Sequence, residues 1–338
     1  MHYDMGQLLQ ADIDEKPGGG QFDADSVQLQ KFFEDTAQSE IVSFLKALGM
    51  GDRLNPHKLD VSMLRRIVED QSVVYSTPPV RELSIDGVTL ADDADEMLAL
   101  NRVLDRMLYD VHWTTIDLLR NLYRQVAVVF TESNPHRCVQ MRIFEPFNLR
   151  RKVDPSARDL LSADEAIAFQ LSVNQDPEHD TFELWTHEDD GTLRAHVVNG
   201  GGELAGPQPY GDDGVSPFGA TAPFFMVYDE LPRNRSYLPV NQNRRGFCLN
   251  SSALLNDICY LIKQEAHSTV VVAADDTRGL PQETGPGKIW SVPGDSSVQV
   301  LSASPKITES AQQLDRVLSY WAVAASLPTD SFSEGKSI

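Results

Sequence analysis

Apolar residues recur at three- and four-residue steps along much of residues 32–123, which is the spacing of amphipathic helices. The pattern predicts helices near residues 32–48, 55–74, 92–108 and 116–123. Gly49 follows the first of these helices, and Pro78 and Pro79 follow the second, as helix-ending signals. Residues 1–21 lack this pattern, close on Pro-Gly-Gly-Gly and are predicted to form a disordered or extended arm.

The middle of the chain changes to alternating or continuous apolar runs, which predict strands. These runs cover residues 126–130, 138–144, 166–173 and 223–231. Two shorter strands are expected around the turn dipeptide Asp86-Gly87.

Residues 180–198 predict a hairpin with a two-residue turn at Asp190-Gly191. That turn places His187 opposite Arg194 and His196 opposite Trp185. The Gly- and Pro-rich residues 199–218 that follow are predicted to form a functional or mobile loop.

The last third of the chain predicts a helix, a strand-rich insert and a second helix. The first helix covers residues 245–267, the insert holds strands near 269–273, 288–292 and 298–302, and the second helix covers residues 305–327. Along one face of the second helix, apolar residues recur at steps of four, three, four, three and four: Ile307, Ala311, Leu314, Leu318, Trp321 and Ala325. Pro328 ends the second helix, and a polar segment follows.

The mixture of predicted helices and strands makes this an α+β protein, and its composition fits a folded, soluble chain with room for two or three modules. The chain has 338 residues, 41% of them hydrophobic and 23% charged. Its apolar runs are far shorter than the roughly 20 residues that cross a bilayer, and the N-terminus lacks the features of a signal peptide. The three cysteines show no CxxC spacing, which favours buried free thiols in a reducing cytosol.

The formal net charge of −21 argues against a protein that grips nucleic-acid phosphates over its whole surface. Such acidity favours plain solubility, and it also suits a surface past which DNA slides without sticking. Composition leaves both interpretations open.

Short motifs give no cofactor site. Residues 335–337 match the end of a phosphate-binding loop, but Asp330 stands where that loop needs glycine. Gly200 and Gly202 fit part of a dinucleotide fingerprint, but Pro207 prevents the helix that must follow.

The histidines and the basic residues are equally unspecific. His187 and His196 are not opposite each other in the predicted hairpin, so ordinary sheet-surface histidines are favoured over a metal site. One basic cluster suits a solvated loop, an acidic neighbouring subunit or a phosphate; it comprises Arg142, Arg150, Arg151 and Lys152. We therefore predict no catalytic residue, no cofactor and no metal, and a protein that is not an enzyme.

The order of parts in the last third resembles the portal protein family of tailed bacteriophages. That family has two stem helices flanking a clip, then a tunnel loop facing a central channel, with a wing of mixed helices and strands before the first stem helix. The resemblance implies an arm at residues 1–21, a wing at 22–244, stem helices at 245–267 and 305–327, a clip at 268–304, and the start of a tunnel loop at 328–338.

The resemblance also implies a function. Copies would form a twelvefold ring at one capsid vertex, through which double-stranded DNA enters during packaging and leaves during ejection. Expected partners are further copies of the chain, the major capsid protein, a head-completion adaptor or tail, and transiently the terminase large subunit. The DNA would be contacted without sequence preference, and the protein would be made in the host cytoplasm and reside in the virion.

The resemblance assigns roles to two groups of residues. The tunnel loop would include Thr329, Asp330, Ser331, Phe332 and Glu334. Packing of the stem helices would use Ile307, Leu314, Leu318, Trp321, Leu254, Ile258 and Leu261. The same apolar face could instead pack inside a monomeric core. Glu309, Asp315, Asp330 and Glu334 are candidates to place negative charge near the channel.

One departure and two alternatives remain. Portal chains continue past the tunnel loop with a long helix and usually a crown, whereas this sequence ends inside the predicted loop. A non-portal virion adaptor or scaffold would share the acidic, motif-free character. A cytosolic hydrolase using carboxylates or histidines of the central sheet is a further alternative.

Overall fold

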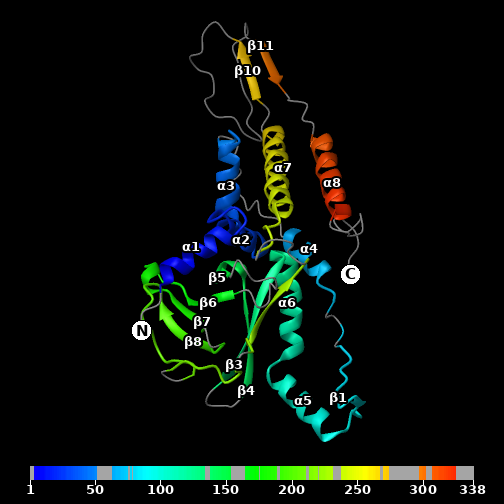
Figure 1. The fold of residues 1–338 in the computed structure, drawn as a ribbon. Helices are drawn as coiled ribbons and strands as arrows, with labels where there is room; N and C mark the ends of the chain where they lie inside the picture. Colours follow the sequence, from blue (N-terminus) through cyan, green and yellow to red (C-terminus); the bar gives the residue numbers. More distant parts are fainter. Residues whose placement is uncertain are drawn as a thin grey trace. The chain divides into compact units, whose positions relative to one another are not determined.

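A computed structural model gives the fold (Figure 1). It describes residues 4–51, 63–74, 77, 79–133, 138–153, 164–174, 176–188, 191–210, 213–219, 221–230, 237–266, 269–273, 297–301 and 307–324. The chain divides into two compact units. Unit 1 comprises Met1–Gln30 and Val68–Gln242, and unit 2 comprises Lys31–Ile67 and Asn243–Ile338.

Unit 1 contains a three-stranded antiparallel sheet in the order β4-β3-β9. Its strands are β3 (Gln125–Ser133), β4 (Cys138–Phe144) and β9 (Phe224–Tyr228). The helices α5 (Asp95–Arg106) and α6 (Tyr109–Tyr123) lie beside it, and α6 packs on β3. Ile116 of α6 and Val126 and Val128 of β3 form part of the resulting apolar core.

Unit 1 also contains a four-stranded antiparallel sheet in the order β5-β6-β7-β8. The strands are β5 (Leu149–Val153), β6 (Asp164–Ser172), β7 (Thr181–His187) and β8 (Leu193–Asn199). Short 3-10 turns, η2 (Pro146–Asn148) and η3 (Pro177–His179), precede β5 and β7. Aromatic rings join this sheet to the other one: Phe169 lies 4.9 Å from Phe144 and 5.7 Å from Phe224, between ring centroids.

A small hairpin of unit 1 follows its sequence signal closely. The strands β1 (Ser84–Ile85) and β2 (Val88–Thr89) pair across Asp86-Gly87. Both turn residues have positive φ, 51° for Asp86 and 79° for Gly87, which is the backbone that this dipeptide favours.

Unit 2 holds the long C-terminal helices. It contains α3 (Gln38–Ala47), nearly all of α7 (Gln242–Ala266) and α8 (Ile307–Ala324). The strands β10 (Thr269–Ala273) and β11 (Ser297–Leu301) form an antiparallel pair between the two long helices in the chain order. The helices α2 (Gln21–Phe33) and α4 (Met63–Gln71) cross the boundary between the units.

The α+β class and most of the predicted elements are confirmed. The strands expected in the middle of the chain are β3, β4, β6 and β9, and those expected at residues 269–273 and 298–302 are β10 and β11. The helix α6 begins at Tyr109, seven residues before its predicted start, and α7 begins at Gln242. The strand predicted at residues 288–292 lies outside the described residues.

Among the helices that the structure describes, none is both long and apolar enough to cross a membrane.

The prediction of a disordered or extended N-terminal arm is wrong. Residues Met5–Glu15 form helix α1, which packs on β5, and Asp4 caps it by accepting a hydrogen bond from the Gln7 amide at 2.9 Å. Met5 and Leu8 are buried against Ala168 and Phe182 of the four-stranded sheet. The Pro-Gly-Gly-Gly segment therefore separates two helices and does not mark a free tail.

The predicted hairpin is present, but its register differs by one residue. His187 lies opposite Leu193, and His196 lies opposite Leu184. The Glu188 amide donates to Thr192 O at 2.9 Å, so three residues connect the strands and not two. Gly191, with φ of 79°, supplies the left-handed position that a three-residue connection requires.

The described part of residues 199–218, predicted to form a functional or mobile loop, is hydrogen-bonded to strand β8. This segment runs along the edge of β8: the Ala195 amide donates to Gly214 O at 2.8 Å, and the Ala205 amide donates to Val197 O at 2.9 Å. It therefore covers the edge of the sheet. As a result His196 is 1% exposed and is not a surface histidine, whereas His187 is exposed.

Candidate functional site

Helix α7, the predicted first stem helix, is enclosed over most of its described length. Ile258 is buried, and Leu254 and Leu261 are half-buried. Polar side chains are enclosed as well, because Asn256 is 0% exposed and Ser252 is 4% exposed. Apolar and small polar side chains of this helix are thus enclosed alike.

Helix α8, the predicted second stem helix, has one covered and one open apolar stripe. Leu318 and Ala322 are buried and Leu314 is half-buried, four residues apart along one face. Tyr320 and Val323 are 76% and 61% exposed. The predicted face is thus covered inside a single chain at Leu318, and the open pair was not singled out from the sequence.

The remaining predicted residues are placed as follows. Glu309 and Asp315 are exposed on α8. The side chains of Ile307 and Trp321 are not described, and Thr329, Asp330, Ser331, Phe332 and Glu334 lie outside the described residues. Packing between copies and a tunnel loop therefore stay predictions.

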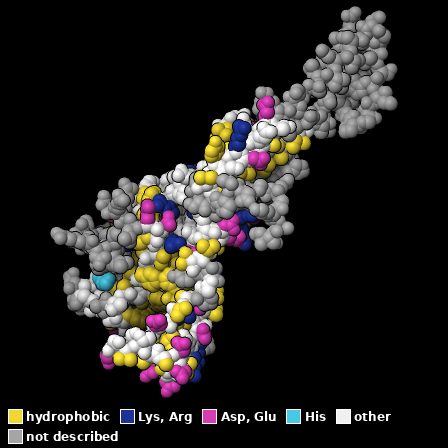
Figure 2. Space-filling model, turned by 90° about the vertical axis from the view of Figure 1, so that its right-hand side faces the viewer, with side chains coloured by type: hydrophobic (Ala, Val, Ile, Leu, Met, Phe, Trp, Pro, Cys, Tyr) yellow, Lys and Arg dark blue, Asp and Glu magenta, His cyan; other side chains and the backbone are white. Residues whose placement is uncertain are grey.

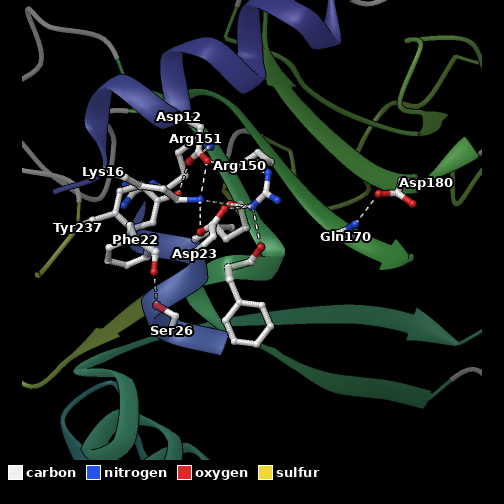
Figure 3. Close-up of polar contacts among 12 residues, drawn as sticks. Asp12, Lys16, Phe22, Asp23, Ser26, Arg150, Arg151, Gln170, Asp180 and Tyr237 are labelled. Atoms are coloured by element: carbon white, nitrogen blue, oxygen red, sulfur yellow. Dashed lines mark hydrogen bonds and ion pairs between the residues drawn. The ribbon is translucent and has the colours of Figure 1, made fainter. Parts of the chain in front are cut away.

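The most elaborate polar arrangement lies in unit 1, where α1, α2, β5 and the segment before α7 meet (Figure 3). We call it the buried ionic cluster; it consists of Asp12, Lys16, Asp23, Arg150, Arg151 and Tyr237. Its residues are up to 225 positions apart in the sequence.

Lys16 lies at the centre of the buried ionic cluster. Its ammonium is 2.7 Å from Asp12 Oδ2 and 2.8 Å from Asp23 Oδ1. The side chains of Lys16 and Asp12 are each 1% exposed. The ammonium also lies 5.6 Å from the ring centroid of Phe22 and 5.4 Å from that of Tyr237, within the range of cation–π attraction. Removing either partner of so enclosed a pair leaves an uncompensated charge.

Asp12 uses its second carboxylate oxygen to join two other segments. Oδ1 accepts a hydrogen bond from the Arg151 amide at 3.0 Å and another from the Tyr237 hydroxyl. Because Arg151 lies on β5 and Tyr237 lies five residues before α7, one carboxylate connects the N-terminal helix to the sheet and to the chain that enters α7.

The two arginines of β5 complete the cluster. Arg150 lies 3.6 Å from Asp23 Oδ2 and donates to the carbonyl oxygen of Phe147 at 2.6 Å. Arg151 is 0% exposed, lies 5.6 Å from the Tyr237 ring centroid and donates to the Tyr228 hydroxyl at 3.2 Å.

Burial affects the titration of two members. It raises the pKa of Tyr237 well above the ordinary value, and the Asp12 carboxylate reinforces the effect, so Tyr237 stays a neutral hydrogen-bond donor. Burial also raises the pKa of Asp23, against the opposing attraction of Lys16 and Arg150.

The segment before α7 has further ties within unit 1. The Leu238 amide donates to Gln125 Oε1 at 2.8 Å, and the Gln242 side chain donates to Asp25 Oδ2 at 2.6 Å. The first residue of α7 is therefore held by side chains as well as by the chain itself.

The basic residues singled out from the sequence bind partners within the chain. Arg150 and Arg151 belong to the buried ionic cluster, and Arg142 pairs with Glu183, whose side chain is 6% exposed, at 2.7 Å. A solvated loop is thus the wrong interpretation for these three arginines. The carboxylates Asp12 and Asp23 were missed. Asp12 lies in residues 1–21, which looked like a free arm, and Asp23 lies just beyond that segment; the neighbouring Arg150 and Arg151 were the available signal. Within the described ranges, no group of three or more His, Cys, Asp or Glu side chains could hold a metal ion.

Comparison with known proteins gives weak structural likenesses. No family model and no curated protein matches this chain. A chain from the virion of a native gene transfer agent (GTA) particle is similar, with 10% identity, a TM-score of 0.41, and coverage of 88% of this chain and 72% of that chain. A chain from the neck of an empty GTA particle has 10% identity, a TM-score of 0.38, and coverage of 88% and 73%. At this identity and TM-score, neither likeness establishes a shared function.

Proposed function

We propose that the chain is a portal-type subunit, copies of which form a ring around a channel for double-stranded DNA at one vertex of a phage-like capsid. The observation that carries the proposal is the chain order of unit 2. A helix of 25 residues, an antiparallel pair of strands and a helix of 18 residues follow one another after a mixed helix and sheet unit. That order matches stem, clip and stem after a wing.

The dimensions of these elements suit the proposal. At 1.5 Å per residue, α7 is about 37 Å long and α8 about 27 Å long, enough for several turns of each helix to face neighbours and a channel. A two-stranded sheet such as β10–β11 is only marginally stable alone, and strands from neighbouring copies would add to it.

The net negative charge of the chain suits a DNA conduit better than a protein that binds DNA tightly. The chain carries 50 acidic and 29 basic residues, and the acidic Glu309 and Asp315 are exposed on α8. Like charge repels DNA phosphate over roughly 8–10 Å at physiological salt. A wall that repels weakly keeps a duplex centred and free to slide, whereas many attractive contacts would hold it in place.

The buried ionic cluster fits the same role mechanically. A portal must keep its stem helices in place while DNA moves, and Asp12 and Tyr237 tie the segment before α7 to helix α1 and strand β5. The capsid protein, the head-completion adaptor or tail, and the terminase are the further partners that this function requires.

Averaged electron images of the purified chain at near-physiological salt test the proposal. We expect rings of about a dozen copies with a central hole. Compact particles without rotational symmetry would contradict it and would reopen the search for an enzyme pocket.

A second experiment addresses the proposed tunnel loop, Thr329–Gly335. Replacing these residues by a shorter segment should leave the rings intact and impair retention of packaged DNA. Normal retention would remove the loop from the mechanism.

A further inference from the structure

Helix α1 is joined to α2 by a glycine-rich hinge. Lys16 is followed by Pro17 and three glycines, and α2 begins at Gln21. Gly18 and Gly19 have φ of 88° and 61°, in the left-handed region that glycine adopts without strain. At Gly18, a Cβ atom would meet no other part of the chain within 4 Å. The chain can therefore change direction at these two glycines without disturbing packed neighbours.

The apolar docking of α1 relies on two side chains. Met5 and Leu8 are buried in a core cluster with Ala168, Phe182, Leu184 and Val198 of the four-stranded sheet. Ile13 of the same helix is 40% exposed. An isolated helix of 11 residues is marginal in water, so α1 depends on this docking to stay helical.

The third buried residue of α1, Asp12, is charged, and so is Lys16 at its C-cap. On the face of the molecule drawn in Figure 2, Lys, Arg, Asp and Glu side chains lie at the surface. The side chains of Asp12 and Lys16, by contrast, are each 1% exposed. If α1 left the sheet, both charges would return to water together, and neither would stay buried without its partner.

The two arginines of β5 would keep partners after α1 detached. Arg150 lies 3.6 Å from Asp23 Oδ2, and Arg151 donates to the Tyr228 hydroxyl at 3.2 Å. Both partners lie outside residues 5–16. Detachment therefore does not strand the cations of the buried ionic cluster.

Tyr237 would lose more than the arginines. It is 0% exposed, its hydroxyl donates to Asp12, and its ring centroid lies 5.4 Å from the Lys16 ammonium. Both of these contacts come from residues 5–16. Tyr237 begins residues 237–242, which lead into α7 and include its first residue; we call them the entry segment. The order of the entry segment therefore depends on whether α1 is docked.

We propose that residues 5–16 form a hinged strap, and that docking of this strap on the four-stranded sheet orders the entry segment. The docked strap places Asp12 and Lys16 on Tyr237. The released strap leaves the entry segment free to move while both sheets stay folded. Because coupling between two sites is reciprocal, an ordered entry segment favours the docked strap to the same extent. The strap and the entry segment belong to unit 1, so the proposal does not depend on a ring.

Hydrogen exchange of the purified full chain, followed by mass spectrometry, tests the proposal with L8A. This substitution removes a buried side chain of the strap and leaves Asp12, Lys16 and Tyr237 unchanged. We expect exchange to become at least about tenfold faster in α1 and, in parallel, in the entry segment. The Leu238 amide reports on the entry segment, because it donates to Gln125 Oε1 at 2.8 Å. Exchange in β3 should stay unchanged.

Two controls accompany L8A. I13A truncates a more exposed side chain of the same helix, and exchange should stay within about twofold of wild type in both places. L8M keeps a large apolar side chain at the docking position and should raise exchange much less than L8A does.

The variant Y237F tests the coupling from the other end. It keeps the aromatic ring and removes the hydrogen bond to Asp12. By reciprocity, exchange in α1 should become severalfold faster, with β3 again unchanged. This measurement tests the proposal even if L8A fails to fold.

Three results would overturn the proposal. Faster exchange in α1 of L8A with an unchanged entry segment would show that the two are independent. Equally faster exchange in β3 would show that α1 belongs to the cooperative core of unit 1 and is not a strap. Unchanged exchange in α1 of Y237F would show that the entry segment does not hold the strap in place.

Discussion

Unit 1 encloses charges, whereas α8 of unit 2 exposes apolar side chains. In unit 1 the side chains of Asp12 and Lys16 are each 1% exposed, and every contact described above for them comes from the same chain. On α8, Tyr320 and Val323 are 76% and 61% exposed, one turn of helix apart. Each region thus inverts the usual distribution of polar and apolar groups.

The two regions obtain their stability in different ways. Buried charges are tolerable when partners and hydrogen bonds are present, and the buried ionic cluster supplies them within one chain. In the proposed ring, the exposed apolar side chains of α8 would be covered by another copy of the chain. The comparison therefore predicts that changes in the cluster unfold the protein, while changes at the open stripe of α8 affect assembly.

The largest expected effect comes from D12A. The variant leaves the enclosed Lys16 with Asp23 as its closest carboxylate and removes the acceptor for the Arg151 amide and the Tyr237 hydroxyl. We expect the free energy of unfolding to fall by about 3–5 kcal/mol in chemical denaturation. The control D14A removes an exposed carboxylate of the same helix and should cost about 0.5 kcal/mol or less. Equal effects of the two variants would show that the cluster does not stabilise unit 1.

The next largest loss of stability is expected for a substitution in the buried stripe of α8, with a substitution in its exposed stripe as the comparison. L318A removes a buried side chain and should cost about 2–4 kcal/mol in the same measurement. V323A removes an exposed one and should change stability by no more than about 0.5 kcal/mol. If V323A destabilised the single chain as much as L318A does, the open stripe would be part of the fold.

A smaller effect is expected for Y237F. The ring keeps its contacts with Lys16 and Arg151, and only the hydrogen bond to Asp12 is lost. The expected cost is about 1–2 kcal/mol, because Asp12 keeps Lys16 and the Arg151 amide as partners. A cost as large as that of D12A would mean that the hydroxyl, and not the ion pair, dominates the cluster.

The smallest expected effect is on how the free energy of unfolding depends on pH. Because the pKa of Asp23 is raised on folding, the folded state binds this proton more tightly than the unfolded state does. Stability from this group therefore falls as pH rises from the ordinary aspartate pKa of about 3.9 through the raised value. D23N should abolish that component, which is visible as the difference between the pH profiles of wild type and variant. A difference of the opposite slope would mean that ion pairing outweighs burial at Asp23.

Local sequence patterns were enough for the elements whose partners lie close in the chain. The alternation in residues 138–144 and the Asp86-Gly87 turn specify β4 and the β1–β2 hairpin directly. The hairpin of β7 and β8 was found, but its register depended on whether Gly191 ends a two- or a three-residue connection, which composition alone does not decide.

Long-range pairing was out of reach. Asp12 meets Arg151 and Tyr237, 139 and 225 positions away, and no local pattern records such partners. The N-terminal helix was missed for the same reason, since the apolar contacts of Met5 and Leu8 are with the four-stranded sheet. On α8 the heptad spacing marked an apolar face, but spacing does not tell whether the same chain or another one covers it.

The particle mass of the full chain in light scattering, at near-physiological salt, tests the central claim most directly. We expect about twelve times the chain mass of 37.6 kDa for wild type, and a much smaller mass for a variant with Tyr320 and Val323 both replaced by lysine. The variant should retain the unfolding free energy of an unassembled wild-type chain. A wild-type chain that stays monomeric at every concentration would contradict the account.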